Sequence, residues 1–188
     1  MAGYDRLTKD GKKFFKELEE LKKLQVKVGF IEDGKGYGKN HEDITAKDYE
    51  RENNKGETEY TTVAQVAAWN ELGTEYTPSR PFLRQSVDNN KDNISAMCKK
   101  QLELVSKGEA TAEKALKAVG AMQVGLVQST IRDGDFKPNA PITIKGGWIR
   151  RKGGKAFKIK GKKSERPLID TGRMRQLVHY VIVKKGED

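Results

Sequence analysis

The chain has 188 residues, of which 35% are hydrophobic and 34% charged, and its formal net charge is +10 at pH 7. This length allows a real core, and we expect a single domain over 1–188 that carries long loops. The single cysteine excludes an internal disulfide framework. We expect neither a signal peptide nor a membrane span, since a span needs an apolar run of roughly 18 residues and none is present.

The first stretch of the chain predicts a helix followed by a strand. Over 10–24 the side chains of Phe14, Leu18 and Leu21 fall on one face of a helix. Residues 26–31 alternate apolar and other side chains, which is typical of a short strand.

Residues 32–58 are polar and contain several glycines, and no periodicity is visible in them. We predict a long extended arm here. The stretch 29–36 nearly spells a phosphate-binding loop, but Gly36 stands where the magnesium-binding hydroxyl belongs, so we do not predict nucleotide binding. The metal-capable side chains at 41–43 lie in this polar loop, where solvation is the simpler interpretation, and we expect no metal site.

A rigid joint follows. Residues 64–72 have helical spacing, and Gly73 stands where a left-handed helix cap is expected. Pro78 and Pro81 prevent a helix from continuing across the joint. On composition alone this is a structural elbow with Phe82 buried in the core.

Two longer helices are predicted next. Residues 82–106 carry an apolar stripe, and the asparagines at 89–93 allow a break in it. Residues 111–132 form the second helix, with Thr111 as its cap and small residues such as Gly120 that let a neighbouring helix approach closely. We expect these helices to pair in opposite directions and to pack on a sheet.

The segment 133–166 is the second predicted arm. Its stretches 142–145 and 156–160 alternate and predict a hairpin. Between 145 and 175 there are twelve Lys or Arg against two acidic residues, an excess of +10 that equals the net charge of the chain. Trp148 stands among these cations. The favoured interpretation is that Trp148 anchors the hairpin onto the domain.

The basic segment 145–163 leaves three interpretations open. It can be a solvated loop, it can face an acidic protein, or it can contact nucleic acid, since cations interleaved with an aromatic suit a phosphate backbone. The candidate contacts to DNA or to an acidic partner are Arg150, Arg151, Lys152, Lys155, Lys158 and Lys160.

The sequence LIDTG at 168–172 invites comparison with an aspartic protease, whose mechanism needs two aspartates that share a proton. Only one copy is present, and Arg173 and Arg175 would hold Asp170 ionised. We therefore expect Asp170 or Thr171 to cap a helical turn that leads into a final strand at 178–183. No Ser-His-Asp or Cys-His set can be assembled, and we expect no enzyme activity and no cofactor.

Two segments carry a resemblance to a known family. The run NELGTEYTPSRPFLRQSVDNN at 70–90 resembles a signature of the tail-completion and head–tail joining (neck) proteins of tailed phages. The stretch PLIDTGRMRQLVHYVI at 167–182 resembles an element near the C-terminus of the same family, in the same order and at a similar separation. Leu177, where serine is more usual, and the long insert at 32–58 depart from the pattern.

From the predicted elements we expect an α+β fold: a small antiparallel or mixed sheet, two longer helices packed on one face, and long extended loops. The resemblance implies a structural virion protein of the neck or tail, assembled in the host cytoplasm, that forms a hexameric ring, terminates the tail tube and joins it to the head. Its partners would be the tail tube protein, the head-completion or connector protein and DNA in the channel. The interface residues expected on this basis are Arg80, Phe82, Arg84, Asp170, Arg173 and Arg175.

Overall fold

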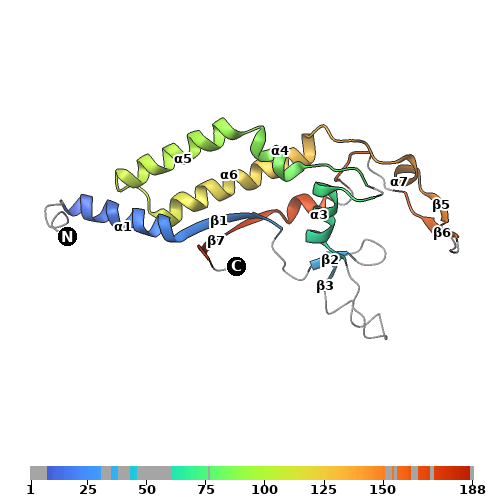
Figure 1. The fold of residues 1–188 in the computed structure, drawn as a ribbon, viewed down its shortest axis with the longest axis horizontal. Helices are drawn as coiled ribbons and strands as arrows, with labels where there is room; N and C mark the ends of the chain where they lie inside the picture. The colour runs from blue at the N-terminus through green and yellow to red at the C-terminus, as the bar shows by residue number, and fades with distance from the viewer. Residues whose placement is uncertain are drawn as a thin grey trace. The chain divides into compact units, whose positions relative to one another are not determined.

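The computed structural model describes residues 8–30, 35–37, 43–45, 61–75, 77–150, 154, 156–161, 165–169 and 172–186. These residues form helices and small antiparallel sheets, so the fold is α+β as predicted. Figure 1 shows these helices and strands. The chain divides into two compact units. We call them the helical unit (Met1–Ile31, Leu83–Val127, Val178–Asp188) and the loop unit (Glu32–Phe82, Gln128–Leu177). Our expectation of one domain over 1–188 stays a prediction.

The helical unit begins with α1 (Lys9–Lys23), which runs directly into β1 (Leu24–Gly29). The hydroxyl of Thr8 caps α1 by accepting from the amide of Gly11 at 3.1 Å. β1 pairs antiparallel with β7 (His179–Lys184), so the two strands predicted near the ends of the chain form one sheet. The pairing joins segments that lie about 150 residues apart in sequence, which a local pattern cannot show.

Three helices complete this part of the chain. α4 (Phe82–Asp88) and α5 (Lys91–Ser106) are separated at the asparagine-rich positions where a break was predicted. α6 (Ala112–Asp133) follows, and the Thr111 hydroxyl accepts from its third amide at 3.3 Å. The sequence did not indicate a second cap: the Glu17 carboxylate on α1 accepts from the Ala112 amide at 2.7 Å. A carboxylate there satisfies an orphan donor and faces the positive end of the helix.

α6 packs closely on the two-stranded sheet at Gly120, which is buried. A Cβ at this position would lie 2.7 Å from the Tyr180 ring on β7 and 2.9 Å from Val26 on β1. A close approach at a small residue was therefore predicted correctly, but the partner is the sheet rather than a neighbouring helix.

The loop unit contains a three-stranded sheet in the order β3-β2-β4, made of β3 (Asp43–Thr45), β2 (Lys35–Tyr37) and β4 (Thr61–Thr62). We predicted an extended arm without regular structure at 32–58. This prediction is wrong for the described part of the segment, because β2 and β3 are paired strands. α3 (Val63–Leu72) follows at once, and Thr62 and Gln65 form a reciprocal capping box with bonds of 3.1 and 2.9 Å.

The second predicted arm holds α7 (Pro141–Lys145) and a hairpin of β5 (Gly147–Arg150) with β6 (Ala156–Ile159). The hairpin was predicted, but its first strand was placed wrongly at 142–145. Pro141 at the first helical position presets a helical φ, and this outweighs the alternation of the residues after it.

The chain then forms α8 (Arg173–Gln176), a short helical turn at the predicted place. Its N-cap position belongs to Gly172, at φ +79°, which has no side chain of its own with which to cap the helix. Asp170 and Thr171, which we predicted as caps, lie outside the described residues.

Each unit has its own buried apolar residues. In the helical unit these are Val105, Ala112, Ala115, Val127 and Val178, and in the loop unit Val63, Ala67, Phe82, Ile131 and Met174.

Candidate functional site

The joint between α3 and α4, residues 73–82, is the elbow that the sequence predicted. Gly73 ends α3, and its positive φ of +82° agrees with the predicted left-handed cap. Its ψ of 168°, however, is extended rather than left-handed helical. A Cβ at Gly73 would lie 2.8 Å from the amide nitrogen of Ser79, so the turn requires glycine for space as well as for backbone angle. Thr74 and Thr77 close the turn with bonds of 2.8 and 3.0 Å.

The far end of the elbow folds back onto the last turn of α3. The hydroxyl of Ser79 donates to the carbonyl of Glu71 at 2.8 Å, and the amide of Arg80 donates to the carbonyl of Asn70 at 2.6 Å. These bonds satisfy carbonyls that a helix end leaves without partners. The resembling segment is therefore a locally closed piece of structure.

Arg80 lies at the centre of the elbow and is only 4% exposed. Its Nε donates to the carbonyl of Lys137 at 2.9 Å, and its Nη1 donates to the side-chain oxygen of Asn70 at 3.2 Å. Its Nη2 donates to the carbonyl of Pro138 at 3.2 Å and to the side-chain oxygen of Asn139 at 3.1 Å. One guanidinium thus joins α3 to a loop 57 to 59 residues further along the chain.

The acceptors around Arg80 are neutral carbonyls and amides, so their dipoles stabilise the charge. Burial lowers the pKa of Arg80 below its ordinary value. An arginine remains charged despite such a shift. Five donors in a fixed fork are what allow one side chain to satisfy acceptors on two separate segments.

The predicted interface residues of the elbow differ in how far their side chains are exposed. The side chain of Phe82 is fully buried, as the structural interpretation of the elbow predicted, and its amide donates to the carbonyl of Arg80 at 2.8 Å. Phe82 and Arg80 therefore offer no side-chain surface to a partner in this structure, whereas Arg84 is exposed. An interface role for the elbow stays a prediction.

In the second resembling segment, Arg173 is 8% exposed, Arg175 is half-buried, and Asp170 lies outside the described residues. The carboxylate near Arg175 that the structure does describe is Asp133, at the end of α6. The Arg132 guanidinium bonds to this carboxylate at 2.9 to 3.0 Å and lowers the pKa of Asp133, and the charges of Arg166 and Arg175 act in the same direction.

Next to this group lies a cavity of about 340 Å³, lined by Ile131, Arg132, Asp133, Gly134, Arg166 and Pro167. Its carboxylate is already paired with an arginine, which favours a structural ion pair over acid–base chemistry. Asn139 completes this region by donating weakly, at 3.5 Å, to the carbonyl of Arg166 while it accepts from Arg80. No sequence signal indicated Asn139.

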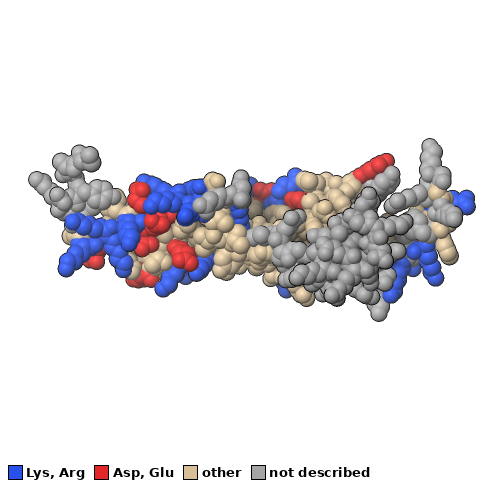
Figure 2. Space-filling model, turned by 90° about the horizontal axis from the view of Figure 1, so that it is seen from below, with Lys and Arg blue, Asp and Glu red and all other residues tan. Residues whose placement is uncertain are grey.

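The β5–β6 hairpin presents the basic segment. Trp148 lies opposite Lys158, and Arg150 lies opposite Ala156. Trp148 is 69% exposed, so the prediction that it anchors the hairpin onto the domain is wrong. Arg150, Lys158 and the following Lys160 are exposed as well, whereas Arg151, Lys152 and Lys155 lie outside the described residues. Figure 2 shows basic side chains over the hairpin, while basic and acidic side chains mix over the helices of the helical unit.

Over the described ranges, no group of three or more His, Cys, Asp and Glu side chains is arranged to hold a metal ion. Within the same ranges, no helix is both long and apolar enough to cross a membrane. No protein-family model, no curated protein and no solved structure matches this chain. We therefore infer function from the residues and contacts described above.

Proposed function

We propose that this chain is a structural protein of the neck or tail of a tailed phage, which forms a ring that terminates the tail tube and joins it to the head. The proposal starts from the resemblance of residues 70–90 and 167–182 to the tail-completion and head–tail joining family. Its work would be contact between proteins rather than catalysis, and it would need no cofactor.

The observation that carries the proposal is the mutual bonding of residues within the first resembling segment. The backbone carbonyl of Asn70 accepts a hydrogen bond from the amide of Arg80, and its side-chain oxygen accepts one from the Arg80 guanidinium. The backbone carbonyl of Glu71 accepts a hydrogen bond from the hydroxyl of Ser79. The members of this motif therefore form one locally bonded unit, and this supports the proposal. It supports a protein in which a rigid elbow holds the surrounding surface in a fixed geometry, as a ring subunit requires.

A ring needs a head-to-tail interface that closes, with different surfaces meeting at each boundary. Arg84 is exposed and Arg175 is half-buried, so these two members of the predicted interface set have side-chain surface for a neighbouring subunit's carboxylates. An arginine–carboxylate pair at such a boundary would fix orientation as well as add affinity. The partners would be further copies of this chain, the tail tube protein and the head-completion or connector protein.

Analysis of purified phage particles by mass spectrometry tests this proposal. The chain should be present in particles purified by density gradient, in a fixed ratio to the tail tube protein that corresponds to one ring. A particle preparation that is infectious and free of this chain would overturn the proposal. Arg84→Glu should reduce incorporation into particles, whereas Lys99→Gln on α5 should not.

A further inference from the structure

One face of the β5–β6 hairpin gathers an aromatic ring and two cations. Successive residues of a strand point to opposite sides, and residues directly opposite each other on paired strands share a side. The register therefore places Trp148, Arg150, Lys158 and Ala156 on the same face. All four are exposed, while Ile149, which points to the other side, is half-buried. The face that carries these four side chains is thus exposed to solvent.

The sequence segment that contains this hairpin carries charged side chains of one sign only. Between residues 136 and 164 the sequence holds ten Lys or Arg and no acidic residue. Such a segment attracts polyanions, and the attraction weakens as salt rises. Charge complementarity therefore selects a partner that carries closely spaced negative charges.

The exposed indole narrows the choice of polyanion. The carboxylates of an acidic protein surface would pair with the lysines and arginines, but they offer no flat surface on which the indole of Trp148 could stack. A nucleic acid offers both phosphates for the cations and flat bases for the ring, and stacking tolerates any base. Bases inside a duplex are already stacked and paired, so an aromatic side chain reaches them in unpaired strands.

We propose that this hairpin face binds single-stranded nucleic acid, with Trp148 stacked on a base and Arg150 and Lys158 in contact with neighbouring phosphates. Trp148 and Arg150 are two residues apart on one strand, which separates them by about 6.6 Å along the strand. Lys158 stands beside Trp148 on the paired strand, so the ring lies between cations. This proposal is independent of the tail-ring proposal, since either one can fail alone.

The test uses the full chain with Trp69→Phe, which leaves Trp148 as the single tryptophan. Titration with a short oligo(dT) at low salt should quench its fluorescence. In anisotropy measurements with a labelled oligo(dT), Trp148→Ala should lower affinity roughly 5- to 150-fold with little change in the salt slope. Lys158→Gln should reduce the slope of log K against log salt by about 0.7, the value for one phosphate contact. Lys99→Gln on α5 is the matched control and should change neither quantity.

Three results would overturn the proposal. The first is that oligo(dT) does not bind at low salt. The second is that duplex DNA of equal length binds as tightly and Trp148→Ala has no effect, which would mean contact with phosphates alone. The third is that polyglutamate competes as well as oligo(dT) and leaves the fluorescence of Trp148 unchanged, which would indicate an acidic protein partner instead.

Discussion

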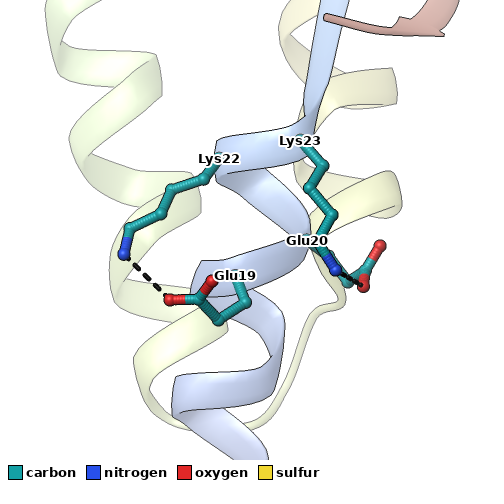
Figure 3. A network of polar contacts seen from close by, with 4 residues as sticks. All are labelled: Glu19, Glu20, Lys22 and Lys23. Atoms are coloured by element: carbon teal, nitrogen blue, oxygen red, sulfur yellow. Dashed lines mark hydrogen bonds and ion pairs between the residues drawn. The ribbon is translucent and has the colours of Figure 1, made fainter.

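The two units use charged side chains in opposite ways. In the helical unit, Lys22 forms an ion pair with Glu19 at 2.9 Å (Figure 3). The exposed fraction is 72% for the Lys22 side chain and 52% for the Glu19 side chain. In the loop unit, Arg80 makes bonds of 2.9 to 3.2 Å with four acceptors while it is 4% exposed. The distances are alike, so distance does not rank these interactions. Burial and the number of partners decide how much each interaction contributes to stability, because water replaces an exposed partner at little cost.

The largest expected effect follows from removing the buried member of this comparison. Arg80→Leu should lower the free energy of unfolding by about 3 kcal/mol, since four partly buried acceptors lose their donor at once. Arg80→Lys should recover only part of this loss, because an ammonium lacks the planar fork that reaches both segments. Urea unfolding followed by the fluorescence of Trp69 on α3 measures the change.

The matched control for Arg80 is the same substitution at an exposed arginine of the loop unit. Arg150→Leu should change the free energy of unfolding by less than about 0.5 kcal/mol. Equal losses for the two variants would contradict the distinction between buried and exposed charge.

A second experiment tests packing in the helical unit with two glycines of one helix. Gly120→Ala should destabilise by about 1–3 kcal/mol, because the new methyl group meets the Tyr180 ring at 2.7 Å and Val26 at 2.9 Å. Gly125→Ala should instead stabilise by up to about 1 kcal/mol, since nothing lies within 4 Å of its Cβ and alanine favours a helix. Thermal unfolding of both variants supplies the measurement, and a stabilised Gly120→Ala would show that α6 does not rest on the sheet as described.

A third experiment concerns the start of α3, where Thr62 and Gln65 cap the helix reciprocally. Thr62→Ala should lower the free energy of unfolding by about 1 kcal/mol, whereas Thr62→Ser, which keeps the hydroxyl, should change it much less. Urea midpoints of the two variants decide between these outcomes. A loss of the same size in both would assign the effect to the threonine methyl group rather than to the cap.

The smallest expected effect belongs to the exposed ion pairs. Glu113 and Lys117 on α6 lie 2.6 Å apart, and the hydrogen bond from Lys117 lowers the pKa of Glu113 below its ordinary value of 4.5. A depressed carboxyl pKa contributes stability above the unfolded pKa, and this contribution disappears as pH falls through the folded pKa. Lys117→Gln should therefore raise the pKa of Glu113 toward 4.5 with little change in the unfolding midpoint at pH 7. An NMR titration of the carboxyl carbon measures the shift, and an unchanged pKa would rule out this pair in solution.

Local patterns located most of the helices. The apolar spacing predicted α1, α3, α5 and α6, and the asparagines marked the break before α5. Both strands of the β1–β7 sheet were also found, but no local pattern indicated that they pair with each other. The first strand of the hairpin was misplaced because the four alternating residues after Pro141 fit a strand and a helical turn equally well. The fixed φ of Pro141 at the first helical position favours the helical turn.

The candidate site was predictable only in part. The sequence pointed to the elbow and to the basic segment, yet it gave no sign that Arg80 is buried, because its acceptors on the loop at 137–139 are far away in sequence. The cap that Glu17 gives to α6 was missed for the same reason. Trp148 was expected to anchor the hairpin onto the domain, whereas its side chain is 69% exposed.

Electron microscopy of lysates from a host that carries the phage without this gene tests the proposed function most directly. The tail-ring proposal predicts filled heads lying apart from tails, and tails of irregular or excessive length would specify a role in ending the tail tube. Supplying the wild-type gene from a plasmid should restore joined particles. Intact, infectious particles in the absence of the gene would contradict the proposal.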